Sequence, residues 1–280
     1  MPELPDLEYL VPRLRGLLEG QKLEKLEVYE PVVLRNLLGE DITRELPLAF
    51  QSVTRHGPFV VLDLGQPSES QLSIIIHPML AGRFSQNRKK KSTMLRLQLS
   101  DGYLDYEDDK KMGKVYLARP EQREAIPGFA KQGMDILSAD FTEEYFLKIA
   151  QKARSQVRVF LMDQSRLSAI GNAYADEILF EAGIHPKTRM NSLKGDDLQR
   201  LYGSLKSVIQ GAIEIIQKAE PALEEKYRQH MKVRNRKDQP CFRCGTKIRR
   251  ANVLGYDAFF CPKCQPDGGK GFIDWSSLER

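Results

Sequence analysis

The feature that most constrains this chain is a group of four cysteines near its end. They form two Cys-x-x-Cys pairs, Cys241 with Cys244 and Cys261 with Cys264. Each pair places two thiolates on a tight turn, and the two pairs together can hold one tetrahedral Zn²⁺ ion. Four protein ligands leave no open position, so we expect a structural zinc with a β-hairpin over the intervening residues 247–260. A redox dithiol would need only one pair, and clustered cysteines fit metal ligation better than disulfides.

The composition of this 280-residue chain indicates a folded protein with room for two domains and a small module. Lysine and arginine number 43 against 38 acidic residues, a net charge of +5 that permits a polyanionic partner without requiring one. The charge is uneven, because residues 226–250 contain ten lysines and arginines and only one acidic residue, Asp238. The sequence has neither a long apolar stretch nor a basic leader with an apolar core, so we expect no membrane association and a cytoplasmic protein.

The first residues, Met1-Pro2-Glu3-Leu4-Pro5-Asp6, have the composition of a reactive terminus. Pro2 is small enough for the initiator methionine to be removed, which would leave a secondary amine as the first atom of the protein. An α-amino group has a pKa near 7.7–8.0, so part of it is unprotonated at neutral pH and can attack an aldehyde carbon. Glu3 is an acid within reach of the same bond. The alternative is a solvated terminus that two prolines stiffen.

A helix is predicted directly after this segment. Leucines between Leu7 and Leu18 recur at helical spacing, and Gly20 is a candidate helix end. Pro12 removes one backbone hydrogen bond, so we expect it to kink the helix or to delay its start. Such a helix would bury its leucines against a sheet and thereby hold the terminal amine in place.

The next hundred residues have the pattern of strands. Residues 94–99 alternate between polar and apolar side chains, and a turn at 100–102 leads into 103–106, which predicts a hairpin. Segments 51–64 and 71–77 supply further strands. Several antiparallel strands with short turns favour a two-layer β-sandwich.

The pattern then changes to that of helices. Thr142 can cap a helix that extends to about Ala153, and 157–163 predicts a short helix. Asn172 is a candidate N-cap for a helix that ends near Gly183. A longer helix carries one apolar stripe, formed by Leu198, Leu201, Leu205, Val208, Ile209, Ala212 and Ile216.

Three segments together make the chain resemble the formamidopyrimidine-DNA glycosylase/endonuclease VIII family of DNA repair enzymes. They are the amino-terminal Pro2–Asp6, the segment Ile170-Gly171-Asn172-Ala173-Tyr174-Ala175 and the four-cysteine segment, and the match covers nearly the whole chain in the same order. The resemblance implies an α+β fold with an N-terminal β-sandwich and terminal helix, a helix-two-turn-helix domain and a C-terminal zinc β-hairpin. We expect the corresponding limits to be a catalytic domain at 1–125, a linker at 126–139, a helical DNA-binding domain at 140–235 and the zinc hairpin with its tail at 236–280.

The resemblance also implies an activity, that of a DNA N-glycosylase and lyase at abasic sites. The Pro2 amine would form a Schiff base at C1′ of a damaged or abasic nucleotide, Glu3 would protonate the opening sugar, and β- or also δ-elimination would cut the strand. Asp6 stands where a glutamate is usual and would support catalysis. The segment between Ala219 and Cys241 is shorter than the one that caps oxidised guanine in relatives, so we expect 8-oxoguanine to be a poor substrate.

The expected partner is damaged or abasic DNA, duplex or single-stranded, bound by a monomer that in a bacterium would lie at the nucleoid. By resemblance, Asn172 binds a phosphate beside the lesion, and Met79 fills the gap left by the extruded base. Lys110 and Met112 stand where the family has an Arg and a Phe for the same purpose. From local sequence alone, Asn172 is an ordinary helix cap and the two methionines are core residues.

At two positions the chain lacks a cationic residue that is usual in the family, so we expect weaker binding to DNA. Pro58 follows Gly57 where a phosphate-binding lysine is usual, and Tyr256 stands where the zinc hairpin usually has an arginine. Arg249 and Arg250, on the other strand of that hairpin, are candidates to replace these contacts. The alternative function is therefore a DNA-binding or damage-recognition protein of the same fold with weak or lost catalysis.

Overall fold

The computed structural model describes residues 2–66, 69–86 and 89–267, and the chain divides into two units. The first unit comprises Met1–Gln132 with Ile216–Tyr227, and the second comprises Gly133–Ile215 with Arg228–Arg280. The chain first passes from one unit to the other after Gln132, and residues 216–227, which we expected in the helical domain, group with the first unit. The expected domain limits stay predictions. Met1, whose removal the predicted chemistry requires, and the tail after Asp267 lie outside the described residues.

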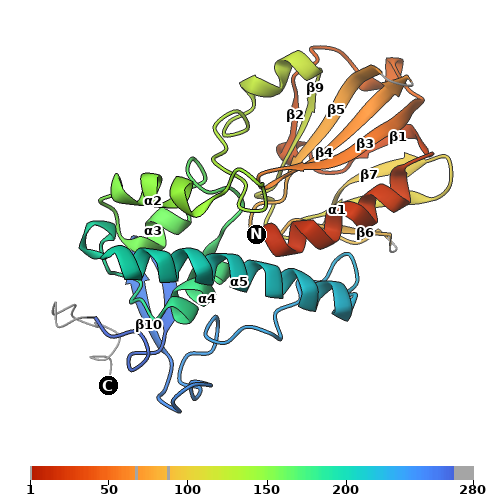
Figure 1. The fold of residues 1–280 in the computed structure, drawn as a ribbon. Coiled ribbons are helices and arrows are strands. Elements are labelled where there is room, and N and C mark those ends of the chain that lie inside the picture. The colour runs from red at the N-terminus through yellow and green to blue at the C-terminus, as the bar shows by residue number, and fades with distance from the viewer. Residues whose placement is uncertain (1, 67–68, 87–88, 268–280) are drawn as a thin grey trace. The chain divides into compact units, whose positions relative to one another are not determined.

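Helix α1 spans Leu4–Leu18 and lies against strand β3, Leu48–His56, in the first unit (Figure 1). All of its leucines except the half-buried Leu17 face inward and are buried, as the helical spacing predicts. The helix begins at Leu4 and continues through Pro12, which lies on the exposed side, so the expected late start was wrong. Burial of leucines on both sides of Pro12 outweighs the one backbone hydrogen bond that the proline removes.

The described part of the first unit contains a nine-stranded sheet with the order β2-β9-β5-β4-β3-β1-β7-β8-β6. All neighbouring strands are antiparallel except β2 and β9. The hairpin predicted from residues 94–106 is confirmed by the pairing of β7 with β8. The other strands are β1 Lys22–Val28, β2 Leu34–Asn36, β4 Phe59–Gln66, β5 Glu69–His77, β6 Arg83–Ser85, β7 Thr93–Leu99, β8 Tyr103–Glu107 and β9 Lys114–Ala118.

The predicted strand region 51–64 contains two strands, because the chain reverses between β3 and β4. Gly57 makes this turn with a φ of +54°, a left-handed conformation that glycine adopts without strain. Three short 3₁₀ helices complete the described first unit, at Pro31–Val33, Ile42–Arg44 and Pro120–Ala125.

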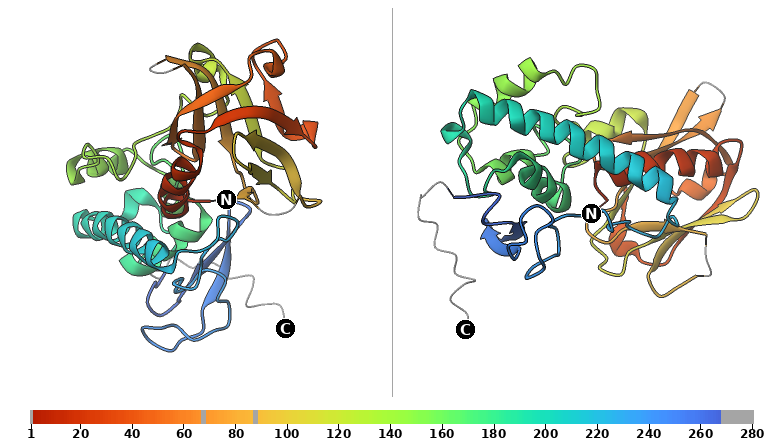
Figure 2. Two further views of the ribbon diagram at one scale, coloured as in Figure 1. Left: turned by 90° about the vertical axis from the view of Figure 1, so that its right-hand side faces the viewer. Right: turned by 60° about the horizontal axis from the view of Figure 1, so that its bottom comes forward.

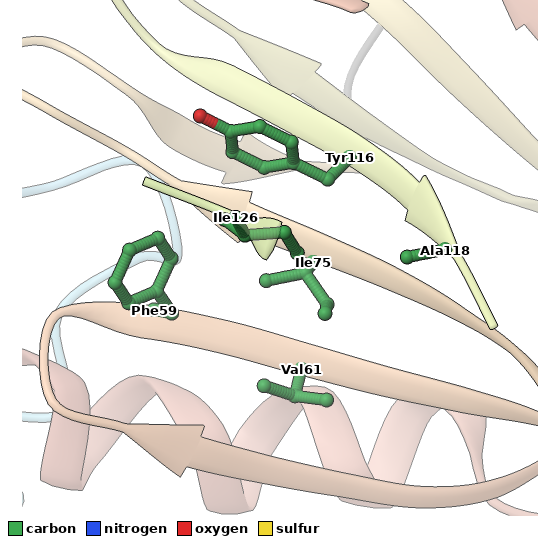
Figure 3. Close-up of a cluster of buried hydrophobic side chains, with 6 residues drawn as sticks. All are labelled: Phe59, Val61, Ile75, Tyr116, Ala118 and Ile126. Carbon is green, nitrogen blue, oxygen red and sulfur yellow. The ribbon is translucent and has the colours of Figure 1, made fainter. Parts of the chain in front are cut away.

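One core of the first unit lies on a face of β4, β5 and β9. Side chains at alternate positions of these strands point toward one another, and Ile126 covers them from the segment that follows β9 (Figure 3). The cluster consists of Phe59, Val61, Ile75, Tyr116, Ala118 and Ile126, all of them buried.

The second unit is helical and ends in a two-stranded hairpin. Its elements are α2 Glu143–Gln151, α3 Val157–Leu161, α4 Asn172–Ala182, the 3₁₀ helix Met190–Ser192, most of α5 Gly195–Ala219, β10 Arg249–Val253 and β11 Tyr256–Phe260. Thr142 caps α2 as predicted, since its hydroxyl accepts a hydrogen bond from the Tyr145 N–H at 3.1 Å. Gly183 ends α4 in the left-handed conformation, also as predicted.

Asn172 differs from its predicted place by one residue. The N-cap of α4 is Gly171, and Asn172 is the first helical residue. Its side chain is held by a buried arginine and does not cap the helix. The strand β11 lies against α4 (Figure 2). There Phe180 joins Val233, Ile248, Phe259 and two cysteines in a second core.

Candidate active site and nucleic-acid interface

The amino-terminal residues Pro2 and Glu3 are buried at the start of α1. The Glu3 N–H donates a hydrogen bond of 2.7 Å to Oδ2 of Asp6, which fixes the first turn. A carboxylate at this end of a helix is also stabilised by the unpaired backbone N–H groups and the helix dipole. Asp6, which we expected to support catalysis, therefore has at least a local structural role. The aspartate side chain is long enough for it, despite being one methylene shorter than glutamate.

A small cavity of about 30 Å³ lies beside Pro2 within the first unit. One wall is α1, another is the segment Gly82–Arg83, and a third is the segment 221–227 that follows α5. The Tyr9 hydroxyl donates to the carbonyl of Pro221 at 2.8 Å, and Lys226 Nζ donates to the carbonyl of Leu80 at 2.7 Å. Sequence reasoning placed no part of 221–227 near Pro2, because nothing local in either segment signals a contact across more than two hundred positions.

The loop after β5 carries the residue that we predicted to fill the gap in DNA. Met79 is half-buried with a φ of +45°, and its N–H donates to Nδ1 of His77 at 3.1 Å. The neighbouring Leu80 is 53% exposed, more than any other apolar side chain of this loop. Sequence reasoning missed Leu80, although an apolar residue beside a candidate wedge was an available signal.

The loop between β8 and β9 carries the other two predicted residues, Lys110 and Met112. Both are exposed, and Met112 has 39% of its surface accessible. The buried carboxylate of Asp108 organises the loop, since it accepts hydrogen bonds from the Lys110 N–H at 3.0 Å and the Gly113 N–H at 2.6 Å. Lys111 has a φ of +53°, and its ammonium group forms an ion pair with Glu30 at 2.7 Å.

Tyr106 brings these two loops together. Its buried hydroxyl lies so close to Gly82 and Gly113 that a Cβ at either glycine would overlap it. Leu80 and Met112 are thus exposed on two loops that share one buried support.

Pro58, which replaces the expected lysine, is buried in the turn between β3 and β4. The structure places no positive charge at this position. Arg55, two residues before Gly57, pairs with Glu8 of α1 at 2.8 Å. The first unit thus lacks the cation expected at position 58.

In the second unit, Asn172 is half-buried at the start of α4. Its side-chain oxygen Oδ1 accepts a hydrogen bond of 2.7 Å from Nη2 of Arg158. Arg158 also pairs with Asp176 at 2.7 Å inside the unit. Burial raises the pKa of the Asp176 carboxyl, while its ion pairs with Arg158 and Arg234 oppose the shift.

The hairpin β10–β11 presents an apolar tip with basic residues behind it. Tyr256 is 57% exposed and Leu254 is 72% exposed. Arg249 and Arg250 are half-buried on β10, and Arg250 lies 3.5 Å from the carboxylate of Asp257. The predicted DNA-binding residues of this module therefore share one hairpin, but one of its two arginines is partly neutralised.

The four cysteines converge at the base of this hairpin, with all four sulfur atoms within 4.8 Å of one another. Two of the separations are 3.9 Å, between Cys241 and Cys264, and 3.5 Å, between Cys244 and Cys261. A tetrahedral ion with Zn–S bonds of about 2.3 Å sets its sulfurs about 3.8 Å apart, so this donor set fits zinc. Hydrogen bonds from Thr246 lower the pKa of Cys244 to about 6, whereas burial raises the pKa of Cys264 to about 12. A cation is needed to hold all four as thiolates.

This combination of a strand-rich unit with a buried amino-terminal Pro-Glu, a helical unit and a four-cysteine hairpin defines the class of DNA glycosylases that resemble formamidopyrimidine-DNA glycosylase. Three family models match successive parts of the chain. They are the formamidopyrimidine-DNA glycosylase N-terminal domain at residues 1–115, the formamidopyrimidine-DNA glycosylase H2TH domain at 132–220, and the zinc finger found in FPG and IleRS at 238–266.

Individual relatives agree with these matches over almost the full length. Formamidopyrimidine-DNA glycosylase from Deinococcus radiodurans is 31% identical over 286 residues, with 95% of this chain and 98% of the relative covered. The Bacillus subtilis protein of the same name is 29% identical, with 95% and 99% covered. The structure of Lactococcus lactis Fpg in complex with DNA that contains an abasic site has a TM-score of 0.83, at 28% identity over 94% of this chain and 99% of that one.

The chain belongs to the formamidopyrimidine-DNA glycosylase family. This membership confirms the predicted family, the predicted fold class, the enzyme class at the level of the family, and the four-cysteine zinc finger. Among the described residues, no helix combines the length and the apolar character that a membrane crossing requires. The roles of individual site residues stay predictions.

Proposed function

We propose that this protein is a DNA glycosylase that also cleaves the strand at abasic sites, with the nitrogen of Pro2 as its nucleophile. The observation that carries the proposal is the burial of Pro2 and Glu3 at the start of α1, with Pro2 lining a cavity. The complex of the Lactococcus lactis relative with abasic DNA supports the same substrate class.

The proposed reaction begins after removal of Met1 exposes the secondary amine of Pro2. The nitrogen lone pair attacks C1′ of the damaged or abasic nucleotide, and the base or hydroxyl group leaves with the bonding pair and takes up the proton that the amine loses. The bond from C1′ to the ring oxygen then breaks, which opens the sugar ring and leaves an iminium ion. Glu3 donates a proton to the ring oxygen. The resulting iminium ion acidifies C2′, so loss of a C2′ proton expels the 3′ phosphate by β-elimination, and a second elimination can follow. Water then releases the enzyme from the sugar fragment.

The described residues suggest how DNA would be held. Lys110 and Met112, together with the loop after β5, fill the gap that the extruded nucleotide leaves. In the second unit, Asn172 and the backbone N–H groups at the start of α4 bind a phosphate. Arg249, Arg250 and Tyr256 extend the contact along the zinc hairpin, whose fold depends on the four cysteines.

The roles of Pro2 and Glu3 can be separated by two variants. Pro2→Gly retains a terminal amine with a different basicity and should reduce cleavage of abasic DNA strongly without abolishing it. Glu3→Gln should impair base excision more than cleavage of a preformed abasic site, because the acid is most needed while the ring still bears its base. Equal loss in both assays would assign Glu3 a structural role at the helix start.

The wedge residue can be identified by a matched pair of substitutions in one loop. Leu80 is more exposed than Met79, so Leu80→Ala should reduce binding to lesion-containing duplex more than Met79→Ala does. Met112→Ala should behave like Leu80→Ala. Fluorescence of 2-aminopurine opposite an abasic analogue measures the insertion directly, and a larger effect of Met79→Ala would restore the sequence-based assignment.

A DNA-binding protein with weak or lost catalysis is the second candidate. It is favoured by Pro58 and Tyr256, which replace two expected cations, and by the partial neutralisation of Arg250. The two candidates differ in one observable, the formation of a covalent intermediate.

A further inference from the structure

We infer that Arg158 and Asp176 are positioning residues that orient the carboxamide of Asn172 toward DNA. The same two side chains connect the start of α4 to strand β11 of the zinc hairpin. The inference rests on the proposed phosphate-binding role of Asn172. It assigns a function to a buried ion pair that the sequence analysis did not single out.

Arg158 lies at the centre of the contacts. Its guanidinium donates from Nε to Oδ1 of Asp176 at 2.7 Å, from Nη2 to Oδ1 of Asn172 at 2.7 Å, and from Nη2 to the carbonyl of Asp257 at 2.9 Å. Arg158 and Asp176 are each only 1% exposed. One side chain from α3 thus reaches two residues of α4 and the backbone of β11.

The chemistry of the guanidinium decides which way Asn172 faces. Arginine has five N–H donors and no acceptor, so the Asn172 atom that contacts it must be the carbonyl oxygen. The NH₂ group of the carboxamide is therefore directed away from Arg158. Two donors on a half-buried side chain at a helix N-terminus are suited to a phosphate oxygen.

Asp176 extends the network to the hairpin. Its Oδ2 accepts from Arg234 Nη1 at 2.7 Å and from the Phe259 N–H at 3.2 Å. Arg234 also donates to the Asp257 carbonyl, at 2.9 Å. The Asp257 carbonyl therefore accepts hydrogen bonds from both arginines. Asp257 is the neighbour of Tyr256, so Arg158 holds this part of β11 as well as Asn172.

This arrangement predicts that Arg158 acts through Asn172 without touching DNA itself. Arg158→Met should weaken binding to a duplex with a tetrahydrofuran abasic analogue by about tenfold, as should Asn172→Ala. Because both remove the same contact, the double variant should also lose about tenfold, whereas independent effects would multiply to about a hundredfold. The salt dependence of binding should keep its slope in Arg158→Met, since no phosphate loses a cation.

Further variants separate positioning from folding and from direct contact. Asn172→Asp keeps an acceptor for Arg158 but has no donor for phosphate, so it should bind as weakly as Asn172→Ala. Arg158→Lys keeps the buried charge beside Asp176 but cannot span three acceptors, so it should give part of the loss and serves if Arg158→Met does not fold. Arg200→Met, which removes an arginine paired with Asp197 at 2.6 Å on α5, is the charge-matched control and should leave the affinity unchanged.

Binding of the tetrahydrofuran duplex should be measured for all variants alongside their Tm and zinc content. Non-multiplicative losses with an unchanged salt slope support the inference. Multiplicative losses, a slope reduced by about one unit in Arg158→Met, or wild-type affinity of Asn172→Asp would each overturn it. Failure of the proposed catalytic function is a separate result, since it would appear as absent strand cleavage while these binding relations are kept.

Discussion

The two units build their sites by different physical means. In the first unit, the amino-terminal Pro2 and Glu3 are held by a helix whose leucines are buried against a sheet. In the second, Asn172 is held by buried charges, and the hairpin beside it converges on four cysteines. Apolar packing is non-directional and loses stability gradually when it is altered. Buried ion pairs and metal sites depend on every partner being present.

Removal of zinc should produce the largest effect, and it should affect the second unit much more than the first. Structural zinc sites of this kind contribute about 10–16 kcal/mol of apparent binding free energy, which is available only to the folded hairpin. Chelation should therefore abolish DNA binding while the helical circular dichroism and the first unit are largely kept. We expect one zinc per chain by atomic emission. If native protein contains no stoichiometric zinc, or if it binds DNA fully after chelation, the hairpin does not depend on zinc.

Shortening a buried side chain of α1 should have the next largest effect, a loss of stability confined to the first unit. Leu7 is fully buried, so Leu7→Ala should lower the free energy of unfolding by about 2–5 kcal/mol and reduce strand cleavage by displacing Pro2. Leu17→Ala, on a half-buried position of the same helix, is the control and should cost less in both assays. Cleavage that is unchanged in a destabilised Leu7→Ala protein would mean that α1 does not position the amine.

The replaced cations should give a smaller effect, visible in the salt dependence of binding. Tyr256→Arg should increase the slope on duplex abasic DNA by about 0.9 per phosphate neutralised. Pro58→Lys should add less, because Pro58 is buried in a turn and the substitution also frees the backbone. If Tyr256→Arg leaves the slope unchanged while Arg249→Ala or Arg250→Ala lowers it, the hairpin arginines already supply the contact.

The last predicted effect is a pH dependence of stability that belongs to the first unit. Burial lowers the pKa of His77 from 6.5 to about 4, so between these values the unfolded chain binds more protons than the folded one. The contribution of His77 to stability is present above about pH 6.5 and is lost as the pH falls toward 4. His77→Asn keeps an acceptor for the Met79 N–H and should flatten the fall in urea-unfolding free energy over this range. An identical pH profile in both proteins would exclude His77 as its source.

The sequence predicted what depends on local pattern. Helical leucine spacing, the Thr142 cap, the turn at 100–102 and the paired cysteines each act within a few residues, and the structure has all of them. The Arg158–Asp176 pair and the contact of 221–227 with the cavity beside Pro2 join positions far apart, so no single-sequence pattern could signal them. Asn172 was misplaced by one residue because its side chain serves Arg158, a partner that capping rules do not consider.

The Pro2 nitrogen should form a covalent bond to the sugar, and borohydride reduction can trap that bond. Mature protein, with removal of Met1 verified by intact mass, is mixed with an oligonucleotide that contains an abasic site and is then reduced with sodium borohydride. We expect one trapped adduct per active chain, with the added mass mapped to the peptide that begins at Pro2, and no adduct from protein that retains Met1. A trapped adduct on a lysine, equal trapping with Met1 retained, or no adduct despite tight binding would contradict it.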